Sequence, residues 1–321
     1  MNSFGRIFRV SIFGESHGDG IGAVVDGVPS GMELSREDFE PDIRRRAPGA
    51  KGTTPRKEAD EIEILSGVYN GRTTGAPLAF IFRNQNTRSG DYSQFEATPR
   101  PGHADYVAQV KWEGANDPRG GGHFSGRITL PIVAAGVIAK KSLGDIDVSA
   151  KIIEVGGEKD GSRWASLLEA ATAEGDSLGG VVECTVDGLP IGLGEPFFDS
   201  VESLISHAVF AIPGVRGIEF GDGFQAARMK GSEHNDLYGE DGYPQTNGAG
   251  GVNGGITNGA PLVFRVAFKP TASIARAQKT WNFKTSKMDT LEIGGRHDVC
   301  FALRTPVIVE AMAAIVLADL L

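Results

Sequence analysis

Along the chain there are short segments in which apolar and polar positions alternate, and others in which several apolar positions stand together. Both patterns predict β-strands. Many of these segments are rich in β-branched residues and are bounded by Gly, Pro or Asp. Such boundaries are typical of turns, because these residues favour turn conformations of the backbone. We expect strands at residues 7–13, 22–25, 61–68, 77–83, 181–186, 217–220 and 262–268.

Longer segments with helical spacing of apolar residues, or with apolar residues throughout, predict helices. These are residues 35–46, 104–112, 131–143, 200–210 and 306–321. Ser35 is expected to cap the first helix, because acidic residues follow it in the early turns. Pro131 and Pro306 begin two of the others, where a Pro is well accommodated. Strands and helices mix without strict alternation, which favours an α+β fold over a doubly wound sheet.

Two parts of the chain resemble each other weakly. Residues 19–31 hold an apolar strand followed by Asp-Gly-Val-Pro, and residues 176–192 hold one followed by Asp-Gly-Leu-Pro. A Pro-started apolar helix closes each half of the chain. This order predicts a single domain over residues 1–321, with an internal repeat whose halves span approximately 1–150 and 151–321. Chance similarity between short turn motifs is the alternative.

Composition is that of a folded globular protein, with 321 residues, 40% hydrophobic and 23% charged. No apolar run reaches the roughly 18 residues that a membrane span needs, and the N-terminus lacks the pattern of a signal peptide. Cys184 and Cys300 alone imply no disulfide framework. We therefore expect a cytoplasmic protein without a membrane partner. The net charge of −9 argues against nucleic-acid binding.

Two short motifs near the N-terminus suggest functions that their surroundings do not support. Gly14-Glu-Ser-His-Gly18 fits the nucleophile elbow of a serine hydrolase, and Gly18-Asp-Gly-Ile-Gly-Ala23 fits a dinucleotide fingerprint. Both motifs require a helix directly after them, whereas a strand and a turn are predicted here. A serine hydrolase is therefore the third hypothesis for function. The sequence also lacks a P-loop motif and a Cys/His spacing typical of zinc sites.

Three histidines in polar, turn-rich segments indicate proton transfer. His17 stands in a Gly-flanked turn, His103 follows Arg100-Pro-Gly, and His297 precedes Asp298. Histidine is suited to this work because its side chain titrates near neutral pH. Arginines stand near Gly, Pro or these histidines at Arg44–Arg46, Arg100, Arg119, Arg127 and Arg296. Their guanidinium groups can hold carboxylates and phosphates through paired hydrogen bonds, although a solvated helix face is the alternative for Arg44.

Eight short motifs together resemble the signatures of the chorismate synthase family. They follow that family's order and cover the chain from residue 4 to its end. The motifs are Phe13-Gly-Glu-Ser-His-Gly18, Arg44-Arg-Arg46, Arg100-Pro-Gly-His-Ala-Asp105, Ser125-Gly-Arg127, Gly221-Asp-Gly-Phe224, Gly250-Gly-Val-Asn-Gly-Gly255, Lys269-Pro-Thr-Ala-Ser273 and Gly295-Arg-His-Asp298.

The resemblance implies a fold, an assembly and a reaction. The fold would be an α+β sandwich in which helices pack between antiparallel sheets, and the assembly would be a homotetramer. The reaction would convert 5-enolpyruvylshikimate 3-phosphate to chorismate and phosphate by 1,4-anti elimination, the last common step toward the aromatic amino acids. Reduced FMN would be required without net redox change, and NADPH would enter only in bifunctional members that reduce their own flavin.

The resemblance also implies roles for individual residues. His17 would protonate the departing phosphate, His103 would keep the reduced flavin in its required protonation state, and Asp298 would assist removal of the ring proton. The implied substrate-binding residues are Ser16, Arg45, Arg46, Lys51, Arg56, Arg100, Arg127 and Arg296. The implied flavin-binding residues are His123, Phe124, Ser125, Pro213, Gly214, Gly254, Lys269, Pro270, Thr271, Ala272, Ser273 and Arg296.

Some positions depart from the family's pattern. Many members carry Arg-Ser-Ser-Ala-Arg where this chain has His123-Phe-Ser-Gly-Arg127. Lys51 replaces a more usual Arg, which removes the two-pronged guanidinium contact. The three residues expected to move protons are unchanged. The second hypothesis, a non-catalytic protein that binds flavin or anions, would be favoured if those three residues were missing.

Overall fold

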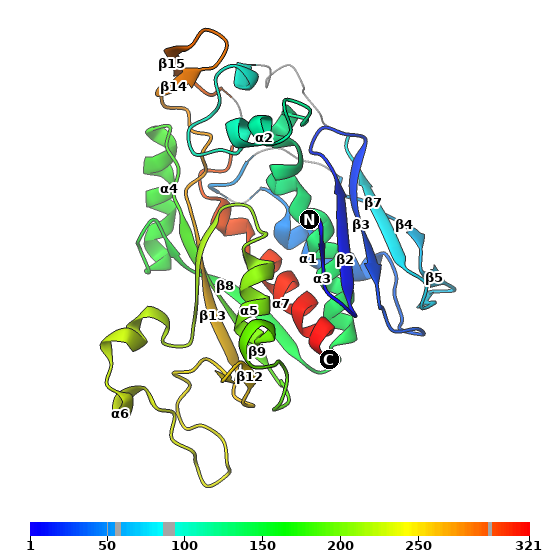
Figure 1. Cartoon of the computed structure of the whole chain (residues 1–321). Helices are drawn as coiled ribbons and strands as arrows, with labels where there is room; N and C mark the ends of the chain where they lie inside the picture. The colour runs from blue at the N-terminus through cyan, green and yellow to red at the C-terminus, as the bar shows by residue number, and fades with distance from the viewer. Residues whose placement is uncertain (50, 55–58, 86–93, 295–296) are drawn as a thin grey trace.

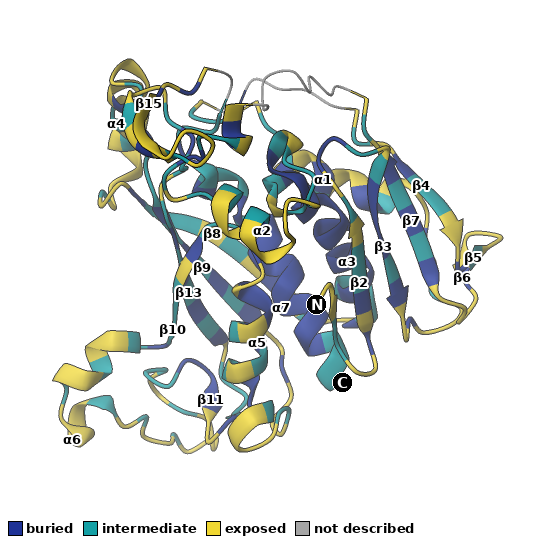
Figure 2. Ribbon diagram, turned by 45° about the horizontal axis from the view of Figure 1, so that its top comes forward, coloured by how far each residue is buried: buried dark blue, intermediate teal, exposed yellow. Residues whose placement is uncertain are grey.

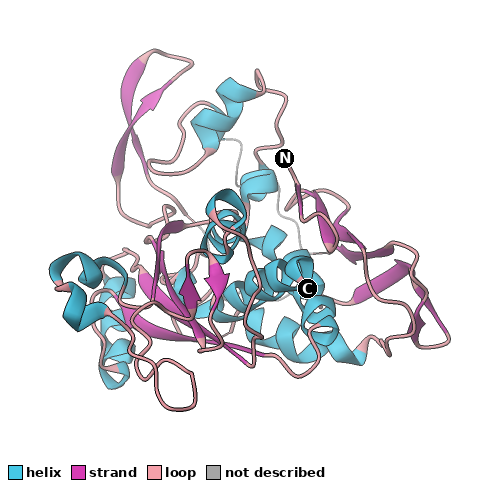
Figure 3. Cartoon of the chain, turned by 60° about the horizontal axis from the view of Figure 1, so that its bottom comes forward, coloured by secondary structure: helices cyan, strands magenta, loops and turns pink. Residues whose placement is uncertain are grey.

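Two antiparallel sheets face each other across a layer of helices (Figure 1). The computed structural model describes residues 1–49, 51–54, 59–85, 94–294 and 297–321. One sheet has the strand order β1-β2-β3-β7-β4, and the other has the order β10-β13-β9-β8. Figure 3 shows the same layers from another side. The expected α+β fold, with helices between antiparallel sheets, is confirmed.

The first sheet contains strands β1 (Ser3–Phe4), β2 (Arg9–Gly14), β3 (Gly20–Asp26), β4 (Ile62–Ser66) and β7 (Leu78–Arg83). The second sheet contains β8 (Asp147–Val155), β9 (Gly180–Asp187), β10 (Val215–Phe220) and β13 (Leu262–Phe268). Small hairpins pair β5 (Val68–Tyr69) with β6 (Arg72–Thr73), β11 (Val252–Asn253) with β12 (Ile256–Thr257), and β14 (Gln278–Asn282) with β15 (Lys287–Leu291). The α-helices are α1 (Glu40–Arg46), α2 (Asp105–Lys111), α3 (Thr129–Ser142), α4 (Trp164–Ala173), α5 (Val201–Val209), α6 (Gly231–His234) and α7 (Pro306–Leu320).

Helices α3 and α7 form the centre of the molecule (Figure 2). Residues 129–139 of α3 and residues 307–317 of α7 are all buried. A helix that is apolar nearly all round must be covered on every side, and the two sheets and the neighbouring helices supply that cover. Buried apolar residues of both sheets and both helices belong to one continuous core. That core links the two halves of the chain.

The two central helices approach closely where α3 carries a glycine. A Cβ atom placed on Gly136 would lie 2.3 Å from the Cβ of Ala311. We therefore expect Gly136→Ala to lower the free energy of unfolding by about 1–3 kcal/mol, because the helices must separate. Denaturant unfolding measures this change. The matched control is Gly231→Ala in α6, whose added Cβ meets no described atom within 4 Å. Equal stability of both variants would contradict the prediction.

The same order of elements occurs in both halves of the chain. The strands β2-β3-β7-β4 lie side by side in one sheet, and β8-β9-β13-β10 lie in the corresponding order in the other. Helices α1 and α5 stand at equivalent places between the second and third strands of each half, and α3 and α7 follow the fourth. An internal repeat would give this order of elements, and the repeat itself stays a prediction.

The expected elements are present, and most boundaries shift by one or two residues, but the predicted cap was wrong. The Ser35 side chain does not cap a helix; instead, the Asp38 carboxylate accepts the backbone N–H of Ser35 at 2.7 Å. A 3-10 turn at Glu37–Phe39 precedes α1, which begins only at Glu40. Pro41 lacks the N–H that would bond one turn back, which accounts for the late start. Strand β8, helix α4 and the β14–β15 hairpin were not predicted.

None of the helices in the described part of the chain is both long and apolar enough to cross a membrane. Several apolar side chains are nevertheless strongly exposed, and they lie on projecting loops. Phe197 and Phe198 follow β9, and Phe224 begins the arm that carries α6. Figure 1 shows this arm extending away from the sheets. These side chains have little cover from the described part of the chain.

Candidate active site

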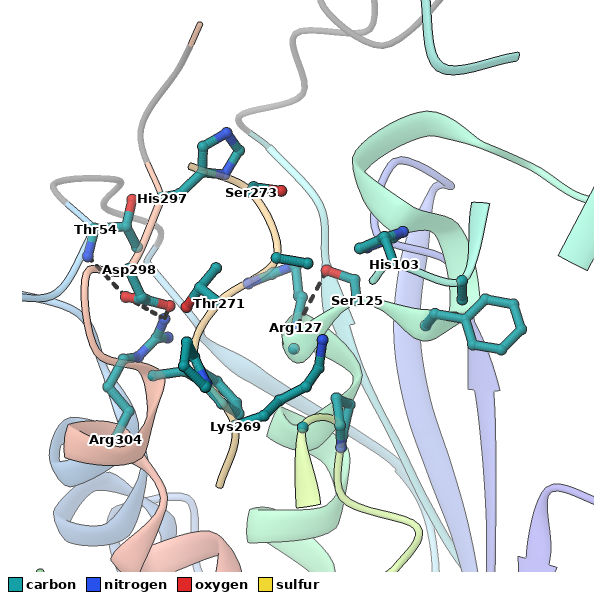
Figure 4. A pocket seen from close by; sticks show the side chains of 18 of the residues that line it. Thr54, His103, Ser125, Arg127, Lys269, Thr271, Ser273, His297, Asp298 and Arg304 are labelled. Carbon is teal, nitrogen blue, oxygen red and sulfur yellow. Dashed lines mark hydrogen bonds and ion pairs between the residues drawn. The ribbon is translucent and has the colours of Figure 1, made fainter. Parts of the chain in front are cut away.

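A cavity of about 540 Å³ lies where loops from both halves of the chain meet (Figure 4). Its wall includes the end of α1, the turn before α2 and the loop before α3. The second half of the chain contributes the segments after β13 and before α7. Cavities of this volume commonly bind small molecules and cofactors.

The cavity is strongly cationic, although the protein as a whole carries a net charge of −9. Among the described residues, six cations and two carboxylates line it, an excess of four positive charges. The carboxylates belong to Asp60 and Asp298, and the cations to Arg46, Arg100, Arg127, Arg216, Lys269 and Arg304. Gathering so many like charges in a partly desolvated space is costly without anions. The lining therefore indicates a polyanionic ligand.

Arg46 and Arg127 form a buried pair of guanidinium groups at one end of the cavity. Arg127 Nη1 donates to the Asp60 carboxylate at 2.9 Å, and Arg46 Nη1 lies 3.7 Å from the same carboxylate. Burial, and then the charge of Arg304, lower the pKa of Arg46 to about 9, against the opposing effect of Asp60. Both guanidinium groups also line the cavity, where an anionic group of a ligand could accept paired hydrogen bonds from them.

His103, Asp105 and Arg100 form a connected group beside the cavity. Arg100 holds the Asp105 carboxylate through Nε at 2.8 Å and Nη2 at 2.7 Å, and His103 Nδ1 lies 2.6 Å from the same carboxylate. Burial by itself would raise the pKa of Asp105, but the hydrogen bonds from Arg100 and His103 hold it well below its usual range. Arg100 Nη2 also lies 3.2 Å from His103 Nδ1, so all three side chains meet at this point.

The lowered pKa of Asp105 predicts a stability effect that depends on pH. A carboxyl group whose pKa is lower in the folded state stabilises the fold above its unfolded pKa, near about 4, and this contribution is lost as the pH falls below it. We expect Asp105→Asn to be less stable than the original chain near neutral pH. The difference should shrink steadily on acidification in urea unfolding series. A difference independent of pH would contradict the ion-pair explanation.

Asp298 is held at the opposite side of the cavity by two donors (Figure 4). The backbone N–H of Thr54 donates to Oδ1 at 2.7 Å, and Arg304 Nη1 donates to Oδ2 at 3.1 Å. The neighbouring His297 also lines the cavity. Burial, and then the charge of Arg100, lower the pKa of His297. Its Nε2 is buried and has no hydrogen-bond partner among the described residues, so a bound ligand could supply one.

Ser16 and His17 lie directly behind the cavity wall, separated from it by Gly120. A Cβ atom on Gly120 would lie 2.6 Å from His17 Cδ2 and 2.8 Å from Ser16 Oγ, and the φ of Gly120 is +60°. Only glycine therefore fits between the cavity and these two side chains. The segment between β2 and β3 that carries Ser16 and His17 contains no helix, so the nucleophile elbow of a serine hydrolase is absent.

Comparisons with known proteins agree on one family. A family model described as chorismate synthase matches residues 8–321. A chorismate synthase of Chitinophaga pinensis is 61% identical, and the match covers 99% of this chain and 96% of that protein. One from Korarchaeum cryptofilum is 46% identical, over 98% of this chain and 96% of its own. A crystal structure of chorismate synthase is similar with a TM-score of 0.74 and 28% identity, over 99% of this chain and 92% of that one.

The chain belongs to the chorismate synthase family.

Most residues that the resemblance assigned to a chorismate synthase site lie together in this cavity. They come from segments far apart in the sequence, and they bring two of the three proposed proton-handling groups, His103 and Asp298, and the proposed flavin segment to one place. The lining residues among them are His103, Asp298, Arg46, Arg100, Arg127, Phe124, Ser125, Pro213, Gly214, Lys269, Pro270, Thr271, Ala272 and Ser273. Arg56 and Arg296 lie outside the described residues.

Four assigned residues lie away from the cavity and make other contacts. Arg45 donates to the buried carboxylate of Glu310 at 2.7 Å, and Lys51 pairs with Glu169 at the surface. His123 Nδ1 lies 2.7 Å from the carbonyl oxygen of Gly14, and Gly254 lies at the turn of the β11–β12 hairpin. Within one chain, these four residues therefore do not line the cavity with the others.

Several residues that build the site were not predicted from the sequence. Asp60, Arg216, Phe301 and Arg304 line the cavity, and Asp105 orients His103 from outside it. Asp105 could have been found, because it closes the motif Arg100-Pro-Gly-His-Ala-Asp105. Nothing local marks the other four residues, since their importance depends on contacts between distant segments.

Proposed function

We propose that this protein is a carbon–oxygen lyase acting on phosphates that converts 5-enolpyruvylshikimate 3-phosphate to chorismate and phosphate by 1,4-anti elimination in the presence of reduced FMN. Family membership supports a lyase of this kind. The observation that carries the proposal is the cavity in an acidic protein whose described lining holds six cations and two carboxylates. The proposed substrate bears two carboxylates and a phosphate, and these anions complement that excess of positive charge.

The side chains around the cavity could assist the breaking of two bonds in the substrate, a ring C–H bond and the C–O bond to phosphate. Arg46 and Arg127 would bind an anionic group of the substrate at the end where Asp60 joins them. Asp298 would assist removal of the proton from the ring carbon, and His17, which lies behind Gly120, would protonate the phosphate that leaves. A ring C–H bond and the C–O bond to phosphate break while a new double bond forms, so the substrate is neither oxidised nor reduced overall.

The cavity wall also fits a flavin mononucleotide. Phe124, Pro213 and Pro270 offer flat apolar surface, and Lys269 offers a cation for a phosphate. Burial, and then the charge of Arg216, lower the pKa of Lys269, which indicates that an anion beside it would be favourable. Thr271 Oγ1 is buried and has no hydrogen-bond partner in the described part of the chain. Reduced FMN, when bound, supplies an electron-rich ring whose oxidation state is the same before and after the reaction.

His103 is the residue best placed to maintain a protonation state beside such a ring. Its Nδ1 is engaged by Asp105, so its Nε2 can gain or lose a proton without a change of ring orientation. The buried Arg100 in turn fixes Asp105 and also donates to Ser273 Oγ at 3.0 Å. The geometry of Arg100 therefore supports a role in holding His103 and the segment of Ser273 in place.

Product analysis without oxygen tests the proposal. The purified chain is incubated with 5-enolpyruvylshikimate 3-phosphate and photoreduced FMN, and phosphate and chorismate are measured together. We expect both products in equal amounts, and neither when FMN is left oxidised. Binding of substrate and flavin without either product would support the non-catalytic alternative. Phosphate without chorismate would indicate a hydrolase.

We further propose that the chain assembles as a homotetramer. The exposed Phe197, Phe198 and Phe224 support association, because large apolar side chains without cover commonly mark protein interfaces. Light scattering after size exclusion measures the mass of the assembly. A mass of one chain at micromolar concentration would contradict this part of the proposal.

A further inference from the structure

Arg304 stands at the junction between the cavity and the central helix of the fold. It is the last residue of a 3-10 turn, Phe301–Arg304, and α7 begins two residues later. Its side chain is largely buried and faces the cavity. It belongs to no motif that the sequence singled out. Because the adjoining helix α7 is packed on all sides, the core fixes the backbone position from which the Arg304 side chain extends.

The guanidinium group of Arg304 joins two parts of the proposed site. Nη1 donates to Asp298 Oδ2 at 3.1 Å, and Nε donates to the backbone carbonyl of Arg46 at 2.9 Å. Arg46 is the last residue of α1, where carbonyl groups lack helical partners and a cation is favourable. The side chain of Arg46 is itself fixed, with Nε donating to Thr129 Oγ1 at 3.0 Å.

Asp298 depends on this arrangement for its orientation. It lies in residues 297–300, which precede the 3-10 turn and belong to no helix or strand. Among the described residues, its carboxylate accepts hydrogen bonds from the Thr54 N–H and from Arg304. Thr54 also stands in a loop, whereas Arg304 adjoins α7. Of the two donors, Arg304 is therefore the one anchored to the rigid core.

We propose that Arg304 is a positioning residue for the elimination: it orients the Asp298 carboxylate and fixes its distance from the anion-binding Arg46. This inference rests on the proposed function for its kinetic consequence but not for its geometry. A purely structural role, in which Arg304 only closes the C-terminal end of α1, predicts lower stability without a selective loss of turnover. Direct contact with substrate predicts a higher KM instead.

The test compares Arg304→Gln, Arg304→Lys and Arg265→Gln in the full chain loaded with reduced FMN. Arg265 pairs with Glu183 at 3.0 Å on the second sheet and does not line the cavity, so it controls for the loss of a partly buried ion pair. For Arg304→Gln we expect kcat to fall at least about 10-fold, with KM changed by less than about 3-fold, because a general base is misplaced. Arg304→Lys, which keeps the charge but not the two-pronged contact, should recover part of the rate. Arg265→Gln should retain the original kcat.

A double-mutant cycle separates positioning from an independent contribution. In the background of Asp298→Asn, Arg304→Gln should change kcat by less than about 2-fold, because the carboxylate it orients is gone. Equal effects of Arg304→Gln with and without Asp298 would overturn the proposal. So would a KM effect with an unchanged kcat.

Hydrogen exchange at Thr54 provides a readout that does not depend on activity. The Thr54 amide donates to Asp298, so its exchange should be at least about 10-fold faster in Arg304→Gln, while amides of α7 keep their protection. Unchanged exchange at Thr54 would overturn the proposal even in a chain that turns over no substrate. If the original chain forms no chorismate but Thr54 exchange responds as expected, the proposed function fails and the positioning geometry stands.

Discussion

Replacing Asp298 by Asn is expected to lower kcat by at least about 100-fold, within the range of general acid–base groups. The amide keeps an acceptor for the Thr54 N–H but cannot take up a proton. Binding of FMN and substrate should change little, because the cations around the cavity remain. Anaerobic turnover with reduced FMN, together with calorimetric titration of both ligands, measures these effects.

A matched substitution separates chemistry from the loss of an ion pair. Asp176 has the same kinds of partner as Asp298, a backbone N–H from Ser177 at 2.8 Å and Arg276 at 2.9 Å, but it does not line the cavity. Asp176→Asn should therefore leave turnover unchanged. If Asp298→Asn melts at lower temperature and yet keeps its turnover per folded chain, Asp298 only stabilises the loop by pairing with Arg304.

Replacing Arg127 by Ala is expected to weaken substrate binding by about 2–5 kcal/mol, the usual result of removing one partner of a buried charge pair. Arg127 lies at the cavity wall with 8% of its side chain exposed, and its guanidinium also fixes Asp60 and Asn84. Removing this cation leaves the negative charge of Asp60 with less compensation. That charge would then repel an anionic substrate. Calorimetry with 5-enolpyruvylshikimate 3-phosphate measures the loss.

An uncharged ligand provides the internal control for Arg127. Riboflavin carries the flavin ring without the phosphate, so its affinity should change by less than about 3-fold in Arg127→Ala. Arg265→Ala removes an arginine outside the cavity and should leave the affinity for both ligands unchanged. An equal loss for substrate and riboflavin would mean that Arg127 holds the shape of the cavity and does not contribute its charge.

Much of the site could be predicted because its motifs keep chemically distinctive residues close together. His103 and Asp105 share one short turn, and the resulting ion pair is local. Resemblance to the family placed Asp298 and the proposed flavin segment at Lys269 in one site, and both line the cavity. Arg45 was also assigned to the site by this resemblance, but it does not line the cavity. It is adjacent to Arg46, yet it extends to Glu310 while Arg46 lines the cavity, because neighbouring helical residues point in different directions.

Local properties of the sequence determined most of the strands and helices and the apolar character of the two central helices, but not β8, α4 or the β14–β15 hairpin. Periodicity, turn residues and proline act within a few residues, and one chain segment is enough to express them. Only the tertiary structure decided that Arg304 meets Asp298, that Asp60 joins Arg46 to Arg127, and that Gly120 covers His17. These contacts connect segments far apart in the chain or depend on how a loop turns. Their distances follow from the packing of α3 and α7 between two sheets, which no local pattern encodes.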